Sequence, residues 1–364
     1  KANSFVKTKF RCTVQSLFLH QFKSQNCYKQ NDALKRNWEA SVLEVNSSAT
    51  IESGNGFKRM FVENKLSLGI FCPLESYERD VPAMQDQERL AKLTEELGYA
   101  ALWFRDVPLR DPSFGDVGQI FDVWVYLSWI AAQTKDITLA TGSVILPIRH
   151  PLHTAKAAAS IDQLSNGRLV LGVASGDRPV EFPAFNVDIE TRGERFRDHF
   201  DVIKQALEES FPHIQCQSSV LKGMADTIPK PVGKLPFLVT GNSQQSLGWI
   251  AANADGWITY PRPLDSQAKI IQQWREELKK NANEKFKPFA QSFYIDLSED
   301  PDEAPTPIHL GFRGGTKVLT EFLEQCQLIG VNHVALNLKI GKRPAEEVIA
   351  EIGETVLPNF KINN

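Results

Sequence analysis

The 364-residue sequence lacks features that would place it in several large classes of protein. It has no apolar run near 18 residues, so no membrane-spanning helix is expected. Its five cysteines are scattered without a C-x-x-C pair or a Cys/His cluster, which argues against a disulfide framework and a metal site. The first residues contain no continuous apolar core of the kind found in secretory signal peptides. We therefore expect a cytoplasmic protein.

Strong charge and several catalytic motifs are also missing. The net charge of −3 gives no reason to expect nucleic acid or a membrane as partner. The phosphate loop G-x-x-x-x-G-K-[ST] does not occur, and G-x-G-x-x-G does not follow the first apolar strand. The absence of H-x-x-x-H, G-x-S-x-G and paired catalytic carboxylates removes support for metallohydrolases, α/β-hydrolases and glycosidases. The remaining composition, 42% hydrophobic and 23% charged, is that of an ordinary globular protein.

Residues 1–60 differ from the rest of the chain. They are rich in Ser, Asn and Gln, show poor periodicity, and contain no acidic residue before Asp32. Two interpretations remain open: a partly ordered extension lying on the surface, which we favour, and a basic targeting segment. Residues 61–364 are expected to form one domain.

From Leu66 onward, short apolar runs alternate with amphipathic stretches, and each of eight runs is followed by a helical segment. This rhythm predicts an α/β protein, a (β/α)8 TIM barrel with an insertion at about 179–234, after the fourth strand. An open doubly wound sheet is the alternative, but such sheets usually have fewer strands and a glycine-rich phosphate loop. The expected strands are 66–73, 99–106, 137–146, 168–174, 235–242, 255–261, 288–297 and 331–340.

Ligand sites in such barrels lie at the carboxyl ends of the strands, where two loops predict an anion site. After the fourth strand, Ser175, Gly176 and Asp177 offer backbone amides and a hydroxyl. Arg178 adds a guanidinium group suited to phosphate or carboxylate.

The second anion loop follows the fifth strand. Gly241 permits a sharp turn, and Asn242 or Ser243 is expected as the N-cap of the next helix. The free amides of that helix would favour an anion, and Gln245 adds a side-chain donor. Either loop alone is also explained by ordinary capping or a surface salt bridge. Two such loops on neighbouring strands together predict a phosphorylated ligand across the barrel mouth.

Acid–base candidates are few. His150 stands between Arg149 and Pro151 after the third strand, where it either acts as an acid or base or caps the following helix. Asp106, at the end of the second strand, is the other candidate at this rim.

Four segments together resemble the bacterial luciferase-like monooxygenase family. They are LATGSVILPIRHP, AKAAASIDQLSNGRLVLGVASGD, EFPAFNVDIETRGERFRD and LVTGNSQQSLGWIAANADGW, and the resemblance extends from Leu66 to about Phe360. It implies a (β/α)8 barrel that binds reduced FMN or, in some branches, the deazaflavin F420. The flavin ring is then expected near Thr141, Gly142 and Ser143, where the family often carries a bulge or a cis peptide. The phosphate is expected on Ser175, Gly176, Asp177, Gly241, Asn242, Ser243 and Gln245.

The resemblance also implies a function and partners. We expect a flavin-dependent oxidoreductase, a monooxygenase that uses O2 and FMN reduced by a separate flavin reductase, and a homodimer formed through outer helices. F420-dependent hydride transfer, a non-catalytic flavin-binding barrel and a phosphosugar enzyme are the alternatives. Many family members have histidines after the second strand, whereas this chain has Asp106-Val107-Pro108. If an acid or base is needed, Asp106, Arg105, Arg149 or His150 must serve, or the oxygenated flavin must act directly. The substrate is not indicated beyond an apolar or aromatic compound.

Overall fold

The structure is a computed structural model that describes residues 54–116, 118–281 and 285–360. The predictions made for residues 1–53 lie outside the described residues. In the described part of the chain, no helix is long and apolar enough to cross a membrane.

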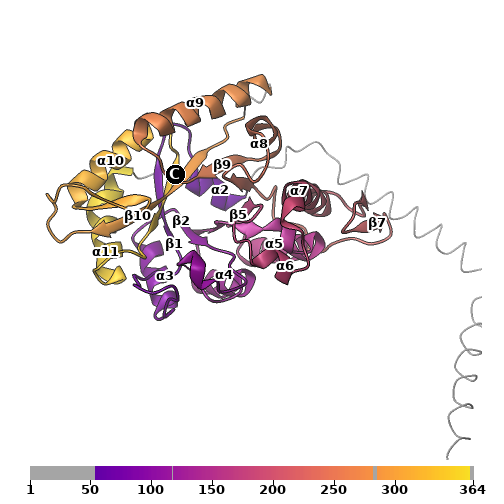
Figure 1. Cartoon of the computed structure of the whole chain (residues 1–364), viewed down its shortest axis with the longest axis horizontal. Coiled ribbons are helices and arrows are strands. Elements are labelled where there is room, and N and C mark those ends of the chain that lie inside the picture. Colours follow the sequence, from indigo (N-terminus) through magenta and orange to yellow (C-terminus); the bar gives the residue numbers. More distant parts are fainter. Residues whose placement is uncertain (1–53, 117, 282–284, 361–364) are drawn as a thin grey trace, which may run out of the picture. The chain divides into compact units, whose positions relative to one another are not determined.

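Eight parallel strands close into a barrel (Figure 1). Each strand pairs in parallel with its neighbour, and the last pairs with the first through Ser67 and His333, which closes the ring. This confirms the predicted (β/α)8 fold. The strands are β1 (Ser67–Phe71), β2 (Ala101–Phe104), β3 (Thr138–Thr141), β5 (Leu169–Ala174), β8 (Phe237–Thr240), β9 (Gly256–Thr259), β10 (Phe289–Leu297) and β13 (His333–Asn337).

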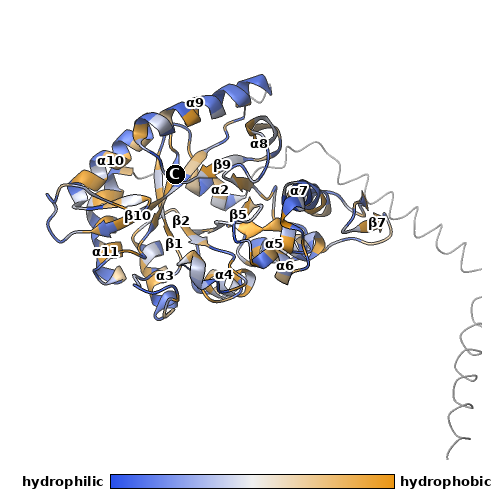
Figure 2. Cartoon of the chain, viewed as in Figure 1, coloured by the Kyte–Doolittle hydropathy of each residue, from blue (hydrophilic) through white to orange (hydrophobic). Residues whose placement is uncertain are grey.

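Helices follow the barrel strands and cover them. Hydrophilic and hydrophobic residues alternate along α9, as expected for a helix with one face on the barrel and one in solvent (Figure 2). The main helices are α3 (Gln87–Glu96), α4 (Val123–Gln133), α5 (Pro151–Leu164), α7 (Arg192–Glu208), α8 (Leu247–Asn253), α9 (Leu264–Lys280), α10 (Thr316–Leu328) and α11 (Ala345–Glu351). Short helical turns are α6 (Glu181–Ala184), η1 (Pro112–Phe114), η2 (Leu146–Ile148), η3 (Ile189–Thr191), η4 (Ile352–Val356) and η5 (Leu357–Phe360).

A helix missed at the sequence level, α2 (Asn55–Met60), packs at the amino-terminal end of the barrel. The Gly56 N–H donates to the Gly167 carbonyl at 3.0 Å, and the Thr138 hydroxyl donates to the Gly56 carbonyl at 2.9 Å. A Cβ on Gly56 would lie 2.4 Å from the Arg168 carbonyl oxygen, so the close approach requires glycine. Met60 is fully buried in the barrel interior. Residues 55–60 therefore belong to the barrel and not, as predicted, to the extension.

Two stretches outside the eight expected strands contain short strands. In the insertion, β6 (His213–Gln215) and β7 (Val220–Lys222) form an antiparallel hairpin. After β10, β11 (Thr306–Ile308) pairs with β12 (Gly311–Gly314), which itself pairs with β10. These strands have three or four residues and bury few side chains, so they carry no apolar run that a sequence pattern can detect.

Candidate functional site

A cavity of about 790 Å³ lies at the carboxyl ends of the barrel strands. Its size is typical of cofactor and small-molecule sites. Most of the residues predicted for the site line this cavity: Asp106, Gly142, Ser143, Ser175, Gly176, Asp177, Gly241, Asn242 and Ser243. The chain segments after β2, β3, β5 and β8 therefore meet as the barrel argument required.

The segment after β3 forms the floor. The expected third strand is interrupted: β3 ends at Thr141, the Gly142–Ser143 peptide is cis, and β4 (Val144–Ile145) follows. A Cβ on Gly142 would lie 3.0 Å from ring atoms of both Phe71 and Trp103. Glycine at this position lets the backbone lie directly on the two aromatic rings, which stand beneath it and do not line the cavity.

The loops after β5 and β8 form an adjoining wall, which we call the cradle, residues 175–177 and 241–244. Gly176, Gly241, Ser243 and Gln244 all have left-handed backbone conformations, with φ between 44° and 88°. Turns of this kind leave backbone N–H groups free to face an anion. The Ser243 hydroxyl donates to the Thr240 carbonyl at 2.8 Å and holds the turn. The backbone conformation of the cradle therefore suits an anion, and the phosphate site stays a prediction.

The helix after β8 begins later than predicted. Its N-cap is Ser246, whose Oγ accepts a hydrogen bond of 3.2 Å from the Trp249 N–H, and not Asn242 or Ser243. Residues 241–245 form a turn instead, because Gly241, Ser243 and Gln244 adopt positive φ and cannot continue a helix. The anion donors therefore belong to this turn and not to the first turn of α8.

Four predicted site residues do not line the cavity among the described residues. The Thr141 hydroxyl is buried and donates to the Gly172 carbonyl at 2.7 Å. Gln245 binds Arg197 through its side-chain oxygen and supports the cradle from behind. His150 is the exposed N-cap of α5, its ring nitrogen accepting from the Leu152 N–H at 3.3 Å, so the capping alternative describes its position. Arg149 binds Asp106 and does not itself line the cavity.

Asp106 and Arg149 form a bidentate ion pair. Arg149 Nε and Nη2 donate to the two carboxylate oxygens at 2.7 and 2.6 Å, and the Ile145 N–H donates to the same group at 3.1 Å. The Asp106 side chain is 1% exposed. Burial alone would lower the pKa of Arg149, but its hydrogen bonds to Asp106 raise it. The pair ties the end of β2 to the segment after β3.

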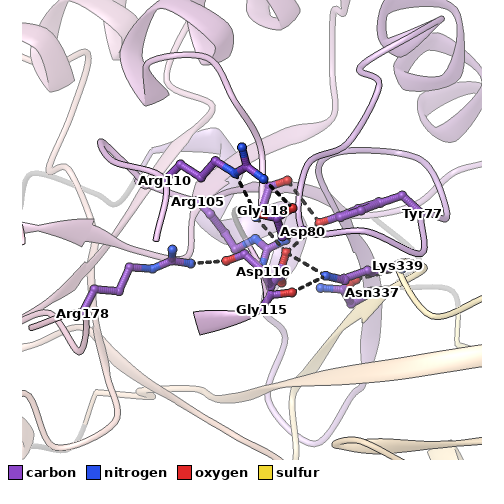
Figure 3. Close-up of polar contacts among 10 residues, drawn as sticks. All are labelled: Tyr77, Asp80, Arg105, Arg110, Gly115, Asp116, Gly118, Arg178, Asn337 and Lys339. Atoms are coloured by element: carbon purple, nitrogen blue, oxygen red, sulfur yellow. Dashed lines mark hydrogen bonds and ion pairs between the residues drawn. The ribbon is translucent and has the colours of Figure 1, made fainter. Parts of the chain in front are cut away.

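A polar cluster at the cavity mouth centres on Asp116, which the sequence did not single out (Figure 3). Its carboxylate accepts from Arg105 at 2.7 Å and from the Tyr77 hydroxyl at 2.8 Å. Lys339 Nζ lies 3.2 Å from the same carboxylate and donates to the Gly115 carbonyl at 3.1 Å. Burial would raise the pKa of Asp116, but the Arg105 guanidinium outweighs it and holds this pKa well below its usual range. The cluster joins the loops after β1, β2 and β13.

The Arg105 and Lys339 positions were visible in the sequence as strand ends, whereas Tyr77 and Asp116 lie in loops. The sequence signal for this loop is the Pro/Gly-rich segment that follows Arg105. The structure shows why glycine is needed there: Gly118 has φ +75°, and a Cβ on it would lie 2.8 Å from the Arg105 guanidinium.

The family model described as luciferase-like monooxygenase matches residues 66–344. The chain therefore belongs to the luciferase-like monooxygenase family, and its fold and membership support an oxidoreductase. An uncharacterized protein of Mycobacterium tuberculosis is 31% identical over 201 residues, which cover 50% of this chain and 71% of that protein. The 4-hydroxyprotoasukamycin monooxygenase of Streptomyces nodosus is 26% identical over 220 residues, or 58% of each chain.

Solved structures share the fold at lower identity. A monooxygenase from Streptomyces bottropensis superposes with a TM-score of 0.69 at 19% identity, covering 81% of this chain and all of the other. An F420-dependent secondary alcohol dehydrogenase gives 0.68 at 17% identity over 82% of this chain and all of that one. The oxygenating component of 3,6-diketocamphane monooxygenase of Pseudomonas putida, solved with FMN, gives 0.64 at 14% identity, with the same coverage.

Proposed function

We propose that the chain is a flavin-dependent monooxygenase that uses reduced FMN and O2 on a small organic substrate. The observation that carries the proposal is the joining of the cradle, the Gly142 floor and Asp106 in one cavity of about 790 Å³. The cradle would offer backbone amides and the Ser175 hydroxyl to a phosphate, and the backbone at Gly142, which carries no side chain, leaves room for a planar ring. The donor set therefore fits a flavin mononucleotide.

The residues of the chain would bind and orient this cofactor. When bound, the reduced flavin supplies the electrons and the site of reaction with O2. The turn at Gly241–Gln244 would hold the phosphate, while Phe71 and Trp103 support the backbone at Gly142 beneath the ring. Asp106 keeps the segment after β3 in place through the Ile145 N–H. Of the predicted acid–base candidates, Asp106 lines the cavity and stays in the proposal, whereas Arg149 and His150 do not line it.

Hydride transfer with F420 is the second candidate, because a solved structure with the same fold is an F420-dependent dehydrogenase. Anaerobic titration of the full chain with reduced FMN and with reduced F420, followed by fluorescence, distinguishes the two. We expect FMN to bind at least tenfold more tightly. Oxygen uptake when a flavin reductase supplies reduced FMN then separates an enzyme from a barrel that only binds flavin. Failure to bind either cofactor would overturn the proposal and favour a phosphosugar enzyme.

We also propose a homodimer formed through α4, in the cytoplasm, with a separate reductase as a transient partner. Val125 and Trp129 lie four residues apart on α4 and are 67% and 42% exposed, and Phe121, just before the N-cap of the helix, is 45% exposed. Such an apolar stripe on an outer helix suits an interface between two copies. Sedimentation of the wild type and of Trp129→Glu tests this: the variant should be monomeric, and an unchanged sedimentation coefficient would count against the interface.

A further inference from the structure

We propose that the part of the cavity outside the cradle binds the carboxylate or sulfonate of an organic acid whose body is aromatic or otherwise apolar. This inference rests on the proposed function, because it assigns to the substrate the space that the flavin would leave. We call this part the acid-binding half. It is lined by Arg105, Phe114, Asp116, Arg178, Tyr294 and Lys339.

The charges of the acid-binding half do not balance. It contains three cations, Arg105, Arg178 and Lys339, and one carboxylate, Asp116, so two positive charges remain. The Asp116 carboxylate is already engaged by Arg105 and by the Tyr77 hydroxyl. Of the other acids nearby, Asp106 is paired with Arg149, and Asp177 lies exposed in the cradle. Glu181 is buried near Arg178, and burial raises its pKa to about 7, so it carries little charge below neutral pH. Excess positive charge in a cavity attracts anions.

Arg178 has a side-chain donor without a hydrogen-bond partner among the described residues. It follows β5, yet its side chain reaches the loop after β2, where Nη2 donates to the Asp116 carbonyl (Figure 3). Its Cζ lies 4.2 Å from the centre of the Phe114 ring. Arg178 is 7% exposed, and its Nη1 is buried without a hydrogen-bond partner among the described residues. A buried guanidinium N–H without an acceptor is unfavourable, and a ligand oxygen would satisfy it. Of the two groups for which the sequence suited Arg178, phosphate or carboxylate, its position outside the cradle favours the carboxylate.

Lys339 approaches from the loop after β13. Its Nζ contacts Asp116 at 3.2 Å and the Gly115 carbonyl at 3.1 Å, and lies 4.6 Å from the centre of the Tyr77 ring. An ammonium group carries three N–H donors, so it retains capacity for a ligand.

The walls between these cations are suited to an apolar body. Phe114 is held beneath the Arg178 guanidinium, and the Tyr294 ring stands on β10 with Leu310 beside it in the lining. Burial raises the pKa of Tyr294 despite the nearby Arg105, so its hydroxyl stays neutral and can donate to a carboxylate. An aromatic acid would place its ring on these side chains and its charged group between Arg178 and Lys339.

The test compares acids with their uncharged amides. Phenylacetate, 3-phenylpropanoate and 2-naphthoate, each paired with its primary amide, are titrated by calorimetry into the full-length chain without flavin. We expect at least one acid to bind tenfold or more tightly than its amide. Arg178→Gln and Lys339→Gln should each remove most of that difference without changing amide affinity. Arg110→Gln is the matched control, because Arg110 pairs with Asp80 and does not line the cavity.

Three results would overturn the proposal: no acid of the series exceeding its amide, an unchanged preference in both variants, or loss of acid binding in Ser243→Asp, which would place the acid in the cradle. A parallel FMN titration keeps the two proposals apart. If the chain prefers acids but does not bind FMN, the flavin proposal is wrong and the acid-binding proposal stands. If it binds FMN but shows no preference for acids, the acid-binding proposal is wrong and the flavin proposal stands.

Discussion

The indole N–H of Trp103 donates a hydrogen bond of 2.9 Å to Nε2 of His333 in the barrel interior. Because indole only donates, Nε2 must be unprotonated, and the ring proton lies on Nδ1, which donates to the Ser67 hydroxyl at 2.6 Å. Ser67 in turn donates to the Met60 carbonyl at 2.6 Å. Burial lowers the pKa of His333 to about 3, so the ring stays neutral. His333 therefore orients the indole that supports Gly142.

Replacing His333 with Leu should destabilise the protein. The change leaves the Trp103 N–H unpaired in a dry interior, which costs about 2 to 3 kcal/mol of unfolding free energy. Urea unfolding measures this loss. His153→Leu, at an exposed position on α5, should change stability by less than about 0.5 kcal/mol. Equal effects from the two substitutions would show that the indole–imidazole bond does not contribute.

Arg149→Gln should lower the free energy of unfolding more than the partial exposure of Arg149 suggests. It leaves the Asp106 carboxylate, 1% exposed, without its cationic partner, which costs about 3 to 5 kcal/mol. Adding Asp106→Asn should restore part of the loss, because the buried charge is removed as well. The exposed Arg89–Glu346 pair provides the comparison: Arg89→Gln should lower the free energy of unfolding far less than Arg149→Gln. A double variant as unstable as Arg149→Gln alone would refute the buried-charge explanation.

The cradle assignment is tested by moving one negative charge along the loop after β8. Ser243→Asp should weaken FMN binding at least tenfold, because the carboxylate faces the phosphate, and Asp tolerates the left-handed backbone at φ +44°. Ser246→Asp is the matched control, since aspartate is an equally good N-cap for α8. Fluorescence titration of both variants gives the affinities. Unaltered FMN binding by Ser243→Asp would rule out the cradle as the phosphate site.

Glu181 should make stability depend on pH near neutrality. It is 1% exposed, its Oε1 has no partner among the described residues, and burial raises its pKa from 4.5 to about 7 despite the nearby Arg178. Between these two values the folded state holds a proton that the unfolded state has lost. The free energy of unfolding should therefore fall as pH rises from 4.5 to 7, and level off above.

Glu181→Gln removes this group from the titration. Thermal unfolding across pH 4 to 8 should show the variant gaining stability relative to the wild type through that interval. If the stabilities of the wild type and the variant changed in parallel with pH, the titration of Glu181 would make no contribution to stability in this interval.

The barrel itself could be predicted because its strands are buried on both faces. Runs such as 169–174 are almost wholly apolar, and each ends at a polar rim residue that locates the site. Helix α2 was missed because its six residues carry no periodic pattern, and it is stabilised by contacts with Gly167 and Thr138 that lie about 80 or more residues away.

The sequence by itself determined the eight βα units, the order of the strands, and the two loops that line one cavity. These follow from local patterns of hydrophobicity and from the rule that parallel strands share a carboxyl end. Only the tertiary structure decided that Arg178 donates to the Asp116 carbonyl and that Arg149 pairs with Asp106. It also decided that His150 is the N-cap of a helix. Such choices depend on which charged groups come within hydrogen-bonding distance after the barrel closes, and no spacing along the chain encodes that distance.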